Sequence, residues 1–479
     1  MRDKIKALEK VSKQLDPNTE IRADWNRDVL NYADNFIEQL DSTKAYSVNE
    51  SNGKGIYDQD ITEHATDLKT LLKHTSKDID AVGINPAAAG HMGYIPGGGL
   101  YPSALGDYIA AIHNRYAGVF YAAPGAVRLE DMLIRWMCKL MGYPNQAVGH
   151  LTSGGSIANL VAIVTARESQ GLKANNIPKA VIYLSEQAHH SIQKALRIAG
   201  LSEAQLRYIP LDEGLRLSIS HLERAIIDDK ANGLKPFFIN ASLGTTNTGA
   251  IDPIENIGEI AKKHHIWFHV DAAYGGFFRL VEKLAPKFKG VSQADSITLD
   301  PHKTLFLPFG TGAVLLKEKT HVLKVFYYLA DYMQDTADAN EILSPADISP
   351  ELTKHFRGMR LWLPLKLFGL KPFRAALEEK LLLARYFHKE IQKIAGFEVG
   401  PEPELSVAMF RYRTQKGDLN EFNTKLIKAI QHDGRIFLSS TTINGVFWIR
   451  VAVVIFRTHL KQIDLLLEII KEKINELET

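Results

Sequence analysis

The spacing of apolar residues divides the chain into three regions, and the first is helical. Residues 1–85 carry apolar positions at helical spacing, among them Trp25, Val29 and Phe36, and the polar stretch 47–55 interrupts them. Such a segment has little core of its own. It is either a solvent-facing helical appendage or an arm that packs on a partner subunit, and we favour the arm.

From residue 86 onward, short β-branched or aromatic runs alternate with helical stretches. The runs predict strands at 180–184, 236–240, 266–270, 296–299 and 312–316, and helices between several of them at 156–168, 192–199 and 254–263. This alternation predicts an α/β domain over residues 86–357, with a mostly parallel central sheet flanked by helices. Ligands of such sheets collect at the carboxyl ends of the strands.

The third region follows a long loop and has a different order of predicted elements. Residues 331–355 are poor in strand signal and rich in Asp, Ala, Pro and Ser, which is typical of a mobile loop within the larger domain. Beyond this loop we expect helices at 358–370, 372–394 and 460–477, with alternating strands at 405–412 and 446–454. Residues 358–479 are therefore predicted to form a smaller α+β domain.

Composition excludes several classes of protein. The chain has 57 Lys and Arg against 55 Asp and Glu, for a net charge of +2, and no segment gathers the basic residues that a nucleic-acid binder needs. No apolar run reaches the roughly 18 residues of a membrane span. The N-terminus does not resemble a secretory signal, and the single cysteine, Cys138, rules out an internal disulfide. We expect a cytoplasmic protein.

A first chemical feature is the turn 152–156, Thr-Ser-Gly-Gly-Ser, between a short strand and a helix. Its two glycines let the backbone approach an anion closely, and the helix that follows presents free N–H groups. The turn is neither a Walker A motif nor a GxGxxG fingerprint. Taken alone, it could equally be the ordinary start of a helix.

Two charged residues follow apolar strands. Asp271 ends the run Ile-Trp-Phe-His-Val, where a buried carboxylate needs a cationic partner or caps a helix. Lys303 lies between two apolar strands. Lysines are usually solvated, but desolvation at this position would disfavour the ammonium form and leave a nucleophilic amine that can form a Schiff base.

Together these residues offer three groups that could bind different parts of one ligand. An anion cradle suits a phosphate, a carboxylate suits a ring nitrogen, and an amine suits an aldehyde, which are the three features of pyridoxal 5'-phosphate (PLP). A metal site at the adjacent pairs His189 and His190, or His264 and His265, is disfavoured because neighbouring histidines diverge on a strand or helix. No metal site is predicted.

The ordered motifs TSGGS, SEQAHHS (185–191), LGTTNTGAID (243–252), HVDAAYGG and DPHK resemble those of the group II PLP-dependent amino acid decarboxylases. That family includes aromatic-L-amino-acid, glutamate and diaminobutyrate decarboxylases. The similarity continues in GYIPGGGLYPSALGDYIA before the cradle and in HFRGMRLWLPLKLFG after the loop. It implies the PLP-dependent transferase fold of type I and a homodimer with its active sites at the subunit interface.

The resemblance assigns roles residue by residue. Lys303 matches the Schiff-base lysine, Asp271 matches the partner of the pyridine nitrogen, and His189 matches the histidine that stacks on the ring. An adjacent carboxylate raises the pKa of a pyridinium by about 1 to 3 units. The remaining matches are the phosphate turn, a threonine near the ring and a histidine beside the lysine: Gly155, Ser156, Thr246 and His302.

The implied reaction is decarboxylation of an L-amino acid to an amine and CO2 through an external aldimine and a quinonoid. Tyr274 resembles the aromatic-amino-acid branch, and the segment beginning at Tyr94 would offer an apolar wall. Arg450 matches an arginine that could orient the substrate carboxylate, although a salt bridge at the edge of the core is an equal alternative. We therefore expect an aromatic L-amino acid as substrate.

Two further positions, Tyr332 and Asp300, bear on the reaction and on the phosphate site. Tyr332 stands near the loop position where amine-forming relatives place a proton-donating tyrosine and aldehyde synthases place phenylalanine, unless it is only a surface tyrosine. Asp300 replaces the asparagine of many relatives, and a carboxylate would repel a phosphate, so no phosphate contact is assigned to it. The open alternatives are a non-aromatic substrate such as glutamate or diaminobutyrate, an aldehyde synthase, and a non-catalytic phosphate-ligand-binding protein.

Overall fold

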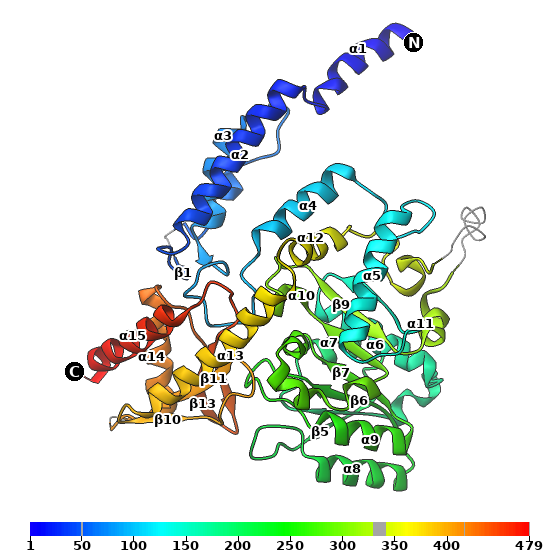
Figure 1. Ribbon diagram of the computed structural model, residues 1–479, viewed down its shortest axis with the longest axis vertical. Helices are drawn as coiled ribbons and strands as arrows, with labels where there is room; N and C mark the ends of the chain where they lie inside the picture. The colour runs from blue at the N-terminus through cyan, green and yellow to red at the C-terminus, as the bar shows by residue number, and fades with distance from the viewer. Residues whose placement is uncertain (49–50, 329–341, 416, 479) are drawn as a thin grey trace.

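The N-terminal arm stands away from the rest of the molecule (Figure 1). The computed structural model describes residues 1–48, 51–328, 342–415 and 417–478. The arm consists of helices α1 (Arg2–Ser12), α2 (Thr19–Gln39) and α3 (Leu68–His74), none of which has a buried residue. Strand β1 (Tyr46–Ser47) pairs with β2 (Gly83–Ile84) where the arm joins the body.

A seven-stranded sheet forms the centre of the large body. Its order is β3, β9, β8, β7, β6, β4, β5. The bounds are β3 (Val148–Thr152), β4 (Ala180–Ser185), β5 (Gln205–Ile209), β6 (Lys235–Ser242), β7 (Trp267–Asp271), β8 (Ser296–Leu299) and β9 (Gly312–Leu316). Strand β9 is antiparallel to both of its neighbours, β3 and β8, and the other neighbouring strands of this sheet pair in parallel. The prediction of a mostly parallel α/β sheet is therefore confirmed.

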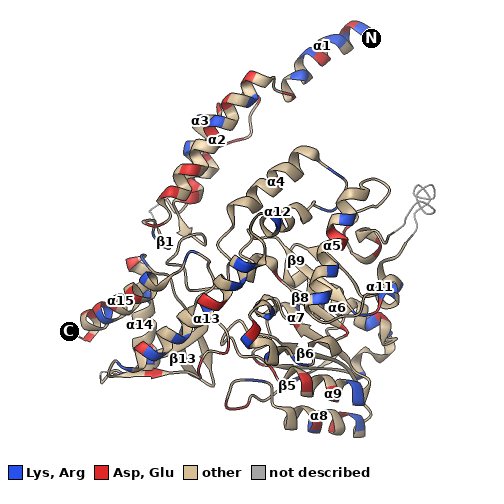
Figure 2. Ribbon diagram, in the orientation of Figure 1, with Lys and Arg blue, Asp and Glu red and all other residues tan. Residues whose placement is uncertain are grey.

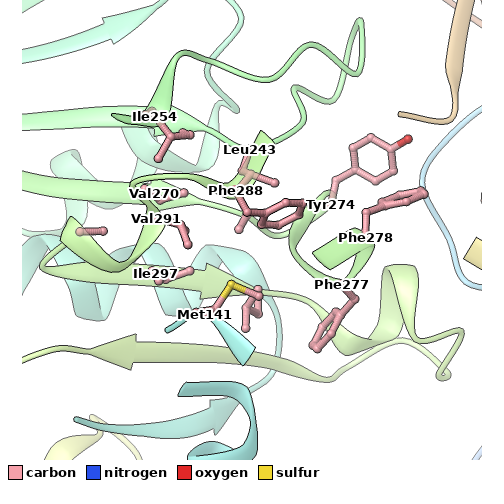
Figure 3. Close-up of a cluster of buried hydrophobic side chains, with 14 of the residues drawn as sticks. Met141, Leu243, Ile254, Val270, Tyr274, Phe277, Phe278, Phe288, Val291 and Ile297 are labelled. Atoms are coloured by element: carbon pink, nitrogen blue, oxygen red, sulfur yellow. The ribbon is translucent and has the colours of Figure 1, made fainter. Parts of the chain in front are cut away.

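Helices cover both faces of this sheet and bury nearly all of its side chains. One layer contains α6 (Gly155–Ser169), α7 (Ser191–Ile198) and α11 (Lys319–Phe326), and the other contains α5 (Pro124–Leu140), α8 (Ile219–Ala231) and α9 (Ile254–His264). Because side chains alternate along a strand, Ile182 and Leu184 join the first core while Val181 and Tyr183 join the second. Figure 3 shows part of the second core, including Val270, Ile297 and Phe277.

A second sheet lies in the C-terminal part, and all its strand pairs are antiparallel. Its order is β10 (Phe397–Val399), β11 (Val407–Tyr412), β13 (Val446–Ala452) and β12 (Ser439–Ile443). The helices of this part are α12 (Gly358–Phe368), α13 (Leu370–Gln392), α14 (Leu419–Asp433) and α15 (Leu460–Glu478). In the described residues, no helix combines the length and the apolar character that crossing a bilayer requires.

The sequence missed several elements at the rims of the two sheets. Strand β5, with the sequence Gln-Leu-Arg-Tyr-Ile, is an edge strand whose side chains are largely exposed, and β12 is another edge strand that is rich in Ser and Thr. Neither has the continuous apolar run of a central strand. The helices α8 and α14 were also missed, although each has the single apolar face that is typical of an amphipathic helix.

The predicted loop at 331–355 lies partly outside the described residues, and its described end is anchored. A 3-10 helix, Pro345–Ile348, begins with a capping box in which Ser344 and Asp347 bond reciprocally. Further along, the ammonium group of Lys354 is fully buried and donates to Glu130 Oε1 at 2.9 Å and to Leu151 O at 3.0 Å. This end of the loop is therefore fixed to the start of the central sheet.

Replacing Lys354 by methionine should lower the free energy of unfolding by about 3 to 5 kcal/mol, because it leaves the buried Glu130 carboxylate without its cation. Denaturant unfolding of the variant and the wild type measures the loss. Adding Glu130→Gln should restore most of it, since a neutral amide still accepts the hydrogen bond that Leu151 N donates to Oε1 at 2.8 Å. Equal stability of the single variant and the wild type would contradict the prediction.

Candidate active site

A cavity of about 430 Å³ opens where β4, β6, β7 and β8 reach their carboxyl ends. Side chains and turns from five separate segments of the chain line it. The seven residues that the sequence matched to cofactor roles all lie on its wall: Gly155, Ser156, His189, Thr246, Asp271, His302 and Lys303. Basic and acidic residues are interspersed over the molecule (Figure 2), so attraction of an anion to this cavity depends on the local groups described below.

The turn between β3 and α6 forms one wall of the cavity. The first hydrogen bonds of α6 are donated by the amides of Ile157 and Ala158 to Gly154 O, so the amides of Gly155 and Ser156 come before the helical hydrogen-bond pattern. A Cβ atom at Gly155 would lie 3.0 Å from Asp300 Oδ2 and 3.4 Å from Ala273 Cβ. A side chain at this position would therefore crowd Asp300 and Ala273, which glycine avoids.

Lys303 follows β8 in the short helix α10 (Pro301–Thr304), and its side chain lines the cavity beside the carboxylate of Asp300. Its Nζ lies 3.0 Å from Oδ2 of Asp300, whose side chain is 2% exposed. The sequence had suggested a desolvated amine with its ammonium form disfavoured. The structure instead places a buried carboxylate next to this amine, so the two groups form an ion pair on the cavity wall.

His302 lies against the same carboxylate. Its Nδ1 is 2.7 Å from Thr311 O, and a carbonyl only accepts, so Nδ1 carries the proton and Nε2 faces Asp300 at 3.8 Å. Burial lowers the pKa of His302. The imidazole is thus neutral near pH 7, which leaves Lys303 as the cation nearest to Asp300.

Asp271 ends β7 and offers its carboxylate to the cavity. Oδ1 accepts from the amide of Ala273 at 3.1 Å, and Oδ2 accepts from Asn159 Nδ2 at 3.0 Å. Both donors are neutral, and among the described residues no basic side chain forms an ion pair with Asp271. The carboxylate, 8% exposed, therefore has room for a cationic partner, and a cationic ring nitrogen could fill this role.

His189 lies in the turn after β4, and its ring faces two neighbours. Its Nδ1 is 2.7 Å from Ser191 Oγ, and its ring centroid is 4.1 Å from that of the exposed His190. Burial lowers the pKa of His189, so its ring is neutral near pH 7 and suited to stacking. In the described residues, no cluster of three or more His, Cys, Asp or Glu side chains could hold a metal.

Arg450 and Tyr94 do not line this cavity. The buried guanidinium of Arg450 donates to Asn247 O at 2.7 Å, to Thr246 O and to Gly93 O at 3.3 Å. Arg450 therefore ties the loop of Thr246 to the segment of Tyr94. Tyr332 lies outside the described residues.

Sequence reasoning missed three groups on the cavity wall. Asn159 is the one side-chain amide among the buried residues of α6, and this isolated amide in an apolar run was the available signal. Gln187 accepts a hydrogen bond from Asn247 Nδ2 at 3.0 Å, which links two turns of the wall. Phe309, 61% exposed, lies at the rim of the cavity and had no sequence signal.

The chain is similar to known proteins in sequence and in fold. The model of the pyridoxal-dependent decarboxylase conserved domain matches residues 51–413. An aromatic-L-amino-acid decarboxylase from Bacillus atrophaeus is 32% identical, covering 89% of this chain and 90% of its own, and a phenylacetaldehyde synthase from Petunia hybrida is 29% identical, covering 84% of each. The crystal structure of Oryza sativa TDC with PLP and tryptamine superimposes with a TM-score of 0.91 at 21% identity, over 97% of this chain and 99% of that one.

Proposed function

This chain belongs to the pyridoxal-dependent decarboxylase family and is a PLP-dependent amino acid decarboxylase, and from that premise we propose that it converts an aromatic L-amino acid to the corresponding amine and CO2. The observation that carries the site assignment is the convergence of Gly155, Asp271 and Lys303 on one cavity. A non-catalytic phosphate-binding protein would need only the first of these residues.

The residues of the cavity suit PLP. The amides at Gly155 and Ser156, with His302 beside them, would hold the phosphate, and the uncompensated carboxylate of Asp271 would pair with the ring nitrogen. When bound, the cofactor supplies an electron-accepting ring for the electrons of the broken Cα–carboxylate bond. Lys303 provides the amine that attaches the cofactor, and Thr246 and His189 would flank the ring.

An aromatic substrate is supported by what the cavity wall lacks. In its described lining, Lys303 is the one lysine and no arginine is present, and Lys303 already pairs with Asp300. A second carboxylate, such as that of glutamate, would enter without a cationic partner. Phe309 at the rim and the ring of Tyr274 offer apolar surface, because the hydroxyl of Tyr274 is engaged with Ser406 at 2.7 Å.

A panel of amino acids tests this proposal. The purified enzyme, supplied with PLP, should release CO2 and an equal amount of amine from tyrosine, tryptophan or phenylalanine. Glutamate and diaminobutyrate should react at least about 100-fold more slowly, because one misplaced charge costs several kcal/mol. Faster turnover of either of these two would overturn the substrate class, and an absence of CO2 from every amino acid would overturn the activity.

The phenylacetaldehyde synthase among the relatives supports an aldehyde synthase as the second candidate function. Such an enzyme consumes O2 and water and releases aldehyde, CO2, ammonia and hydrogen peroxide. We favour amine formation because Tyr332 stands near the sequence position of the proton-donating tyrosine. In this proposal Tyr332 returns a proton to Cα after CO2 has left.

Replacing Tyr332 by phenylalanine should therefore change the product. Without the phenolic proton donor, amine formation should fall at least about 10-fold, and aldehyde and hydrogen peroxide should accumulate under air. Tyr328→Phe, which alters an exposed tyrosine of the same region, is the matched control and should still give the amine. Unchanged amine formation by the Tyr332→Phe variant would remove Tyr332 from the mechanism.

We also propose a homodimer in which the arm covers the partner and the active sites lie at the interface. Support comes from apolar side chains left exposed on the arm and on helix α4 (Tyr101–His113), namely Ile5, Leu8, Val11, Trp25, Tyr108 and Ile112. Light scattering should report twice the chain mass at micromolar concentration, and a monomer would contradict the proposal.

A cytoplasmic location is proposed as well. The single cysteine, Cys138, is buried and unpaired, so the fold needs no oxidising compartment. Fractionation of the source cells tests this proposal, and recovery of the enzyme outside the cytoplasm would contradict it.

A further inference from the structure

The side-chain amide of Asn159 uses all of its hydrogen-bonding capacity beneath the cavity. Its Nδ2 donates to Asp271 Oδ2 at 3.0 Å and to Ser191 Oγ at 2.9 Å. Its Oδ1 lies 2.6 Å from Thr298 Oγ1 and 3.0 Å from His269 Nε2. The residue is 1% exposed. One amide on α6 therefore joins two sheet strands to the turn that carries His189.

The direction of each hydrogen bond follows from Asp271. A carboxylate only accepts, so the NH2 group of Asn159 must face it and the carbonyl oxygen must face His269, whose Nε2 then carries a proton. His269 Nδ1 is consequently an acceptor, and Ser296 Oγ at 2.8 Å is its donor. Ser296 in turn accepts from the indole N–H of Trp267 at 2.9 Å.

All members of this chain are buried, and none carries a charge. Burial holds the pKa of His269 at about 4, so its ring is neutral at physiological pH, as the hydrogen-bond pattern requires. The side chains of Trp267, Ser296 and Thr298 are at most 2% exposed. A chain of hydrogen bonds thus runs from Trp267 through Ser296 and His269 to Asn159, and each bond in it has only one possible direction of donation.

On its other side, Asn159 determines the tautomer of His189. The hydroxyl of Ser191 accepts from Asn159 Nδ2 and therefore turns its own proton toward His189 Nδ1, 2.7 Å away. The amide of Ser191 points to the same ring nitrogen at 3.3 Å. His189 Nδ1 is thus an acceptor, and the ring proton of the neutral imidazole lies on Nε2.

We propose that Asn159 is a positioning residue that holds the Asp271 carboxylate and the His189 imidazole in one fixed geometry. The hydrogen bonds that lead from Trp267 to Asn159 hold the Asn159 side chain itself in place. This inference rests on the proposed roles of Asp271 and His189 toward the cofactor. Two groups of the cavity wall that act on one ring are thereby oriented by a single amide, which is how a site acquires a preorganised arrangement.

The test compares the same substitution at two buried asparagines. Asn159→Ser removes the amide from the network. Asn240→Ser is the matched control, because Asn240 lies beside His269 on the neighbouring strand β6, is 1% exposed and has no hydrogen-bond partner for its side chain among the described residues. We expect kcat to fall about 10-fold to 100-fold in Asn159→Ser, with KM changed less than about 3-fold, and kcat to change less than about 3-fold in Asn240→Ser.

Cofactor binding gives a readout without turnover. Titration of the apoenzyme with PLP, followed by visible absorbance, should show a dissociation constant raised about 5-fold or more in Asn159→Ser and unchanged in Asn240→Ser. Equal effects of the two substitutions on kcat and on this constant would overturn the inference. A wild type that releases no CO2 would instead overturn the proposed function, so the two failures are distinguishable.

A double-mutant cycle separates positioning from mere packing. If Asn159 acts through Asp271 and His189, then adding Asn159→Ser to Asp271→Asn should lower kcat by less than Asn159→Ser lowers it in the wild type. The carboxylate that Asn159 orients is already gone, and only its effect on His189 through Ser191 remains. A full second loss would overturn the inference. If Asn159→Ser does not fold, Ser191→Ala replaces it: cutting only the link to His189 should lower kcat about 3-fold to 10-fold, and no loss would overturn the inference.

Discussion

Replacing Lys303 by alanine is expected to abolish the visible absorbance that wild-type enzyme gains with PLP and to lower kcat by at least about 10⁴-fold. The residue supplies the amine that attaches the cofactor, and removing a covalent catalytic group leaves only the residual effect of binding and orientation. Absorbance spectroscopy of the reconstituted protein and CO2 release measure the two effects.

The control for this prediction is Lys194→Ala, which removes an exposed lysine of α7 and should leave spectrum and turnover unchanged. Because Lys303→Ala also leaves the buried Asp300 carboxylate without its cation, the variant should unfold at a lower temperature. Adding Asp300→Asn should restore stability but not activity. A yellow, active Lys303→Ala enzyme would show that another amine carries the chemistry.

Apolar patterning determined how much of the fold could be predicted. Strands β8 and β9 end where the sequence predicted, because every residue of the runs Ser-Ile-Thr-Leu and Gly-Ala-Val-Leu-Leu is buried between two helix layers. The edge strand β5 was missed because a strand that is open on one side needs no continuous apolar run. Pattern reasoning therefore finds the centre of a sheet more readily than its edges.

The site divides along a similar line. Gly155, Asp271 and Lys303 were found because each follows a strand within a short local motif. The contacts of Asn159 with Asp271 and Thr298 join residues 112 and 139 positions apart, and only the packing of α6 on the sheet brings them together. The contacts of Arg450 could not be predicted for the same reason. Its guanidinium donates to backbone carbonyls of two distant loops, and no pattern of side chains in the sequence indicates such contacts.

The pairing of Asp300 with Lys303 also could not be derived from the sequence alone. The two residues stand three positions apart, so their proximity in a helix was possible, but whether the carboxylate faced the amine or the solvent depended on burial. The structure buries it between Gly155 and Gly312, at 3.0 and 2.7 Å from the Cβ positions that larger residues would occupy. Small residues on both sides make the space in which this carboxylate meets Lys303.

Replacing Asp271 by asparagine should lower kcat about 10-fold to 1,000-fold while the dissociation constant of PLP rises only a few-fold. The substitution keeps the size of the side chain and an acceptor for the amide of Ala273, but it removes the negative charge. A carboxylate raises the pKa of the nitrogen it faces by about 1 to 3 units, which corresponds to about 1.4 to 4 kcal/mol. Stopped-flow absorbance and steady-state CO2 release measure the loss.

Asp252→Asn is the matched control, because it neutralises a buried carboxylate that does not line the cavity. Asp252 accepts from the amides of Leu217 and Ser242 at 2.8 and 2.7 Å, and an asparagine side chain can accept only one of these bonds without turning a donor toward the other. This variant should lose stability but keep kcat within about 3-fold. If both variants lose turnover equally, the effect of Asp271 is structural, whereas loss in Asp271→Asn alone assigns the electrostatic role to its carboxylate.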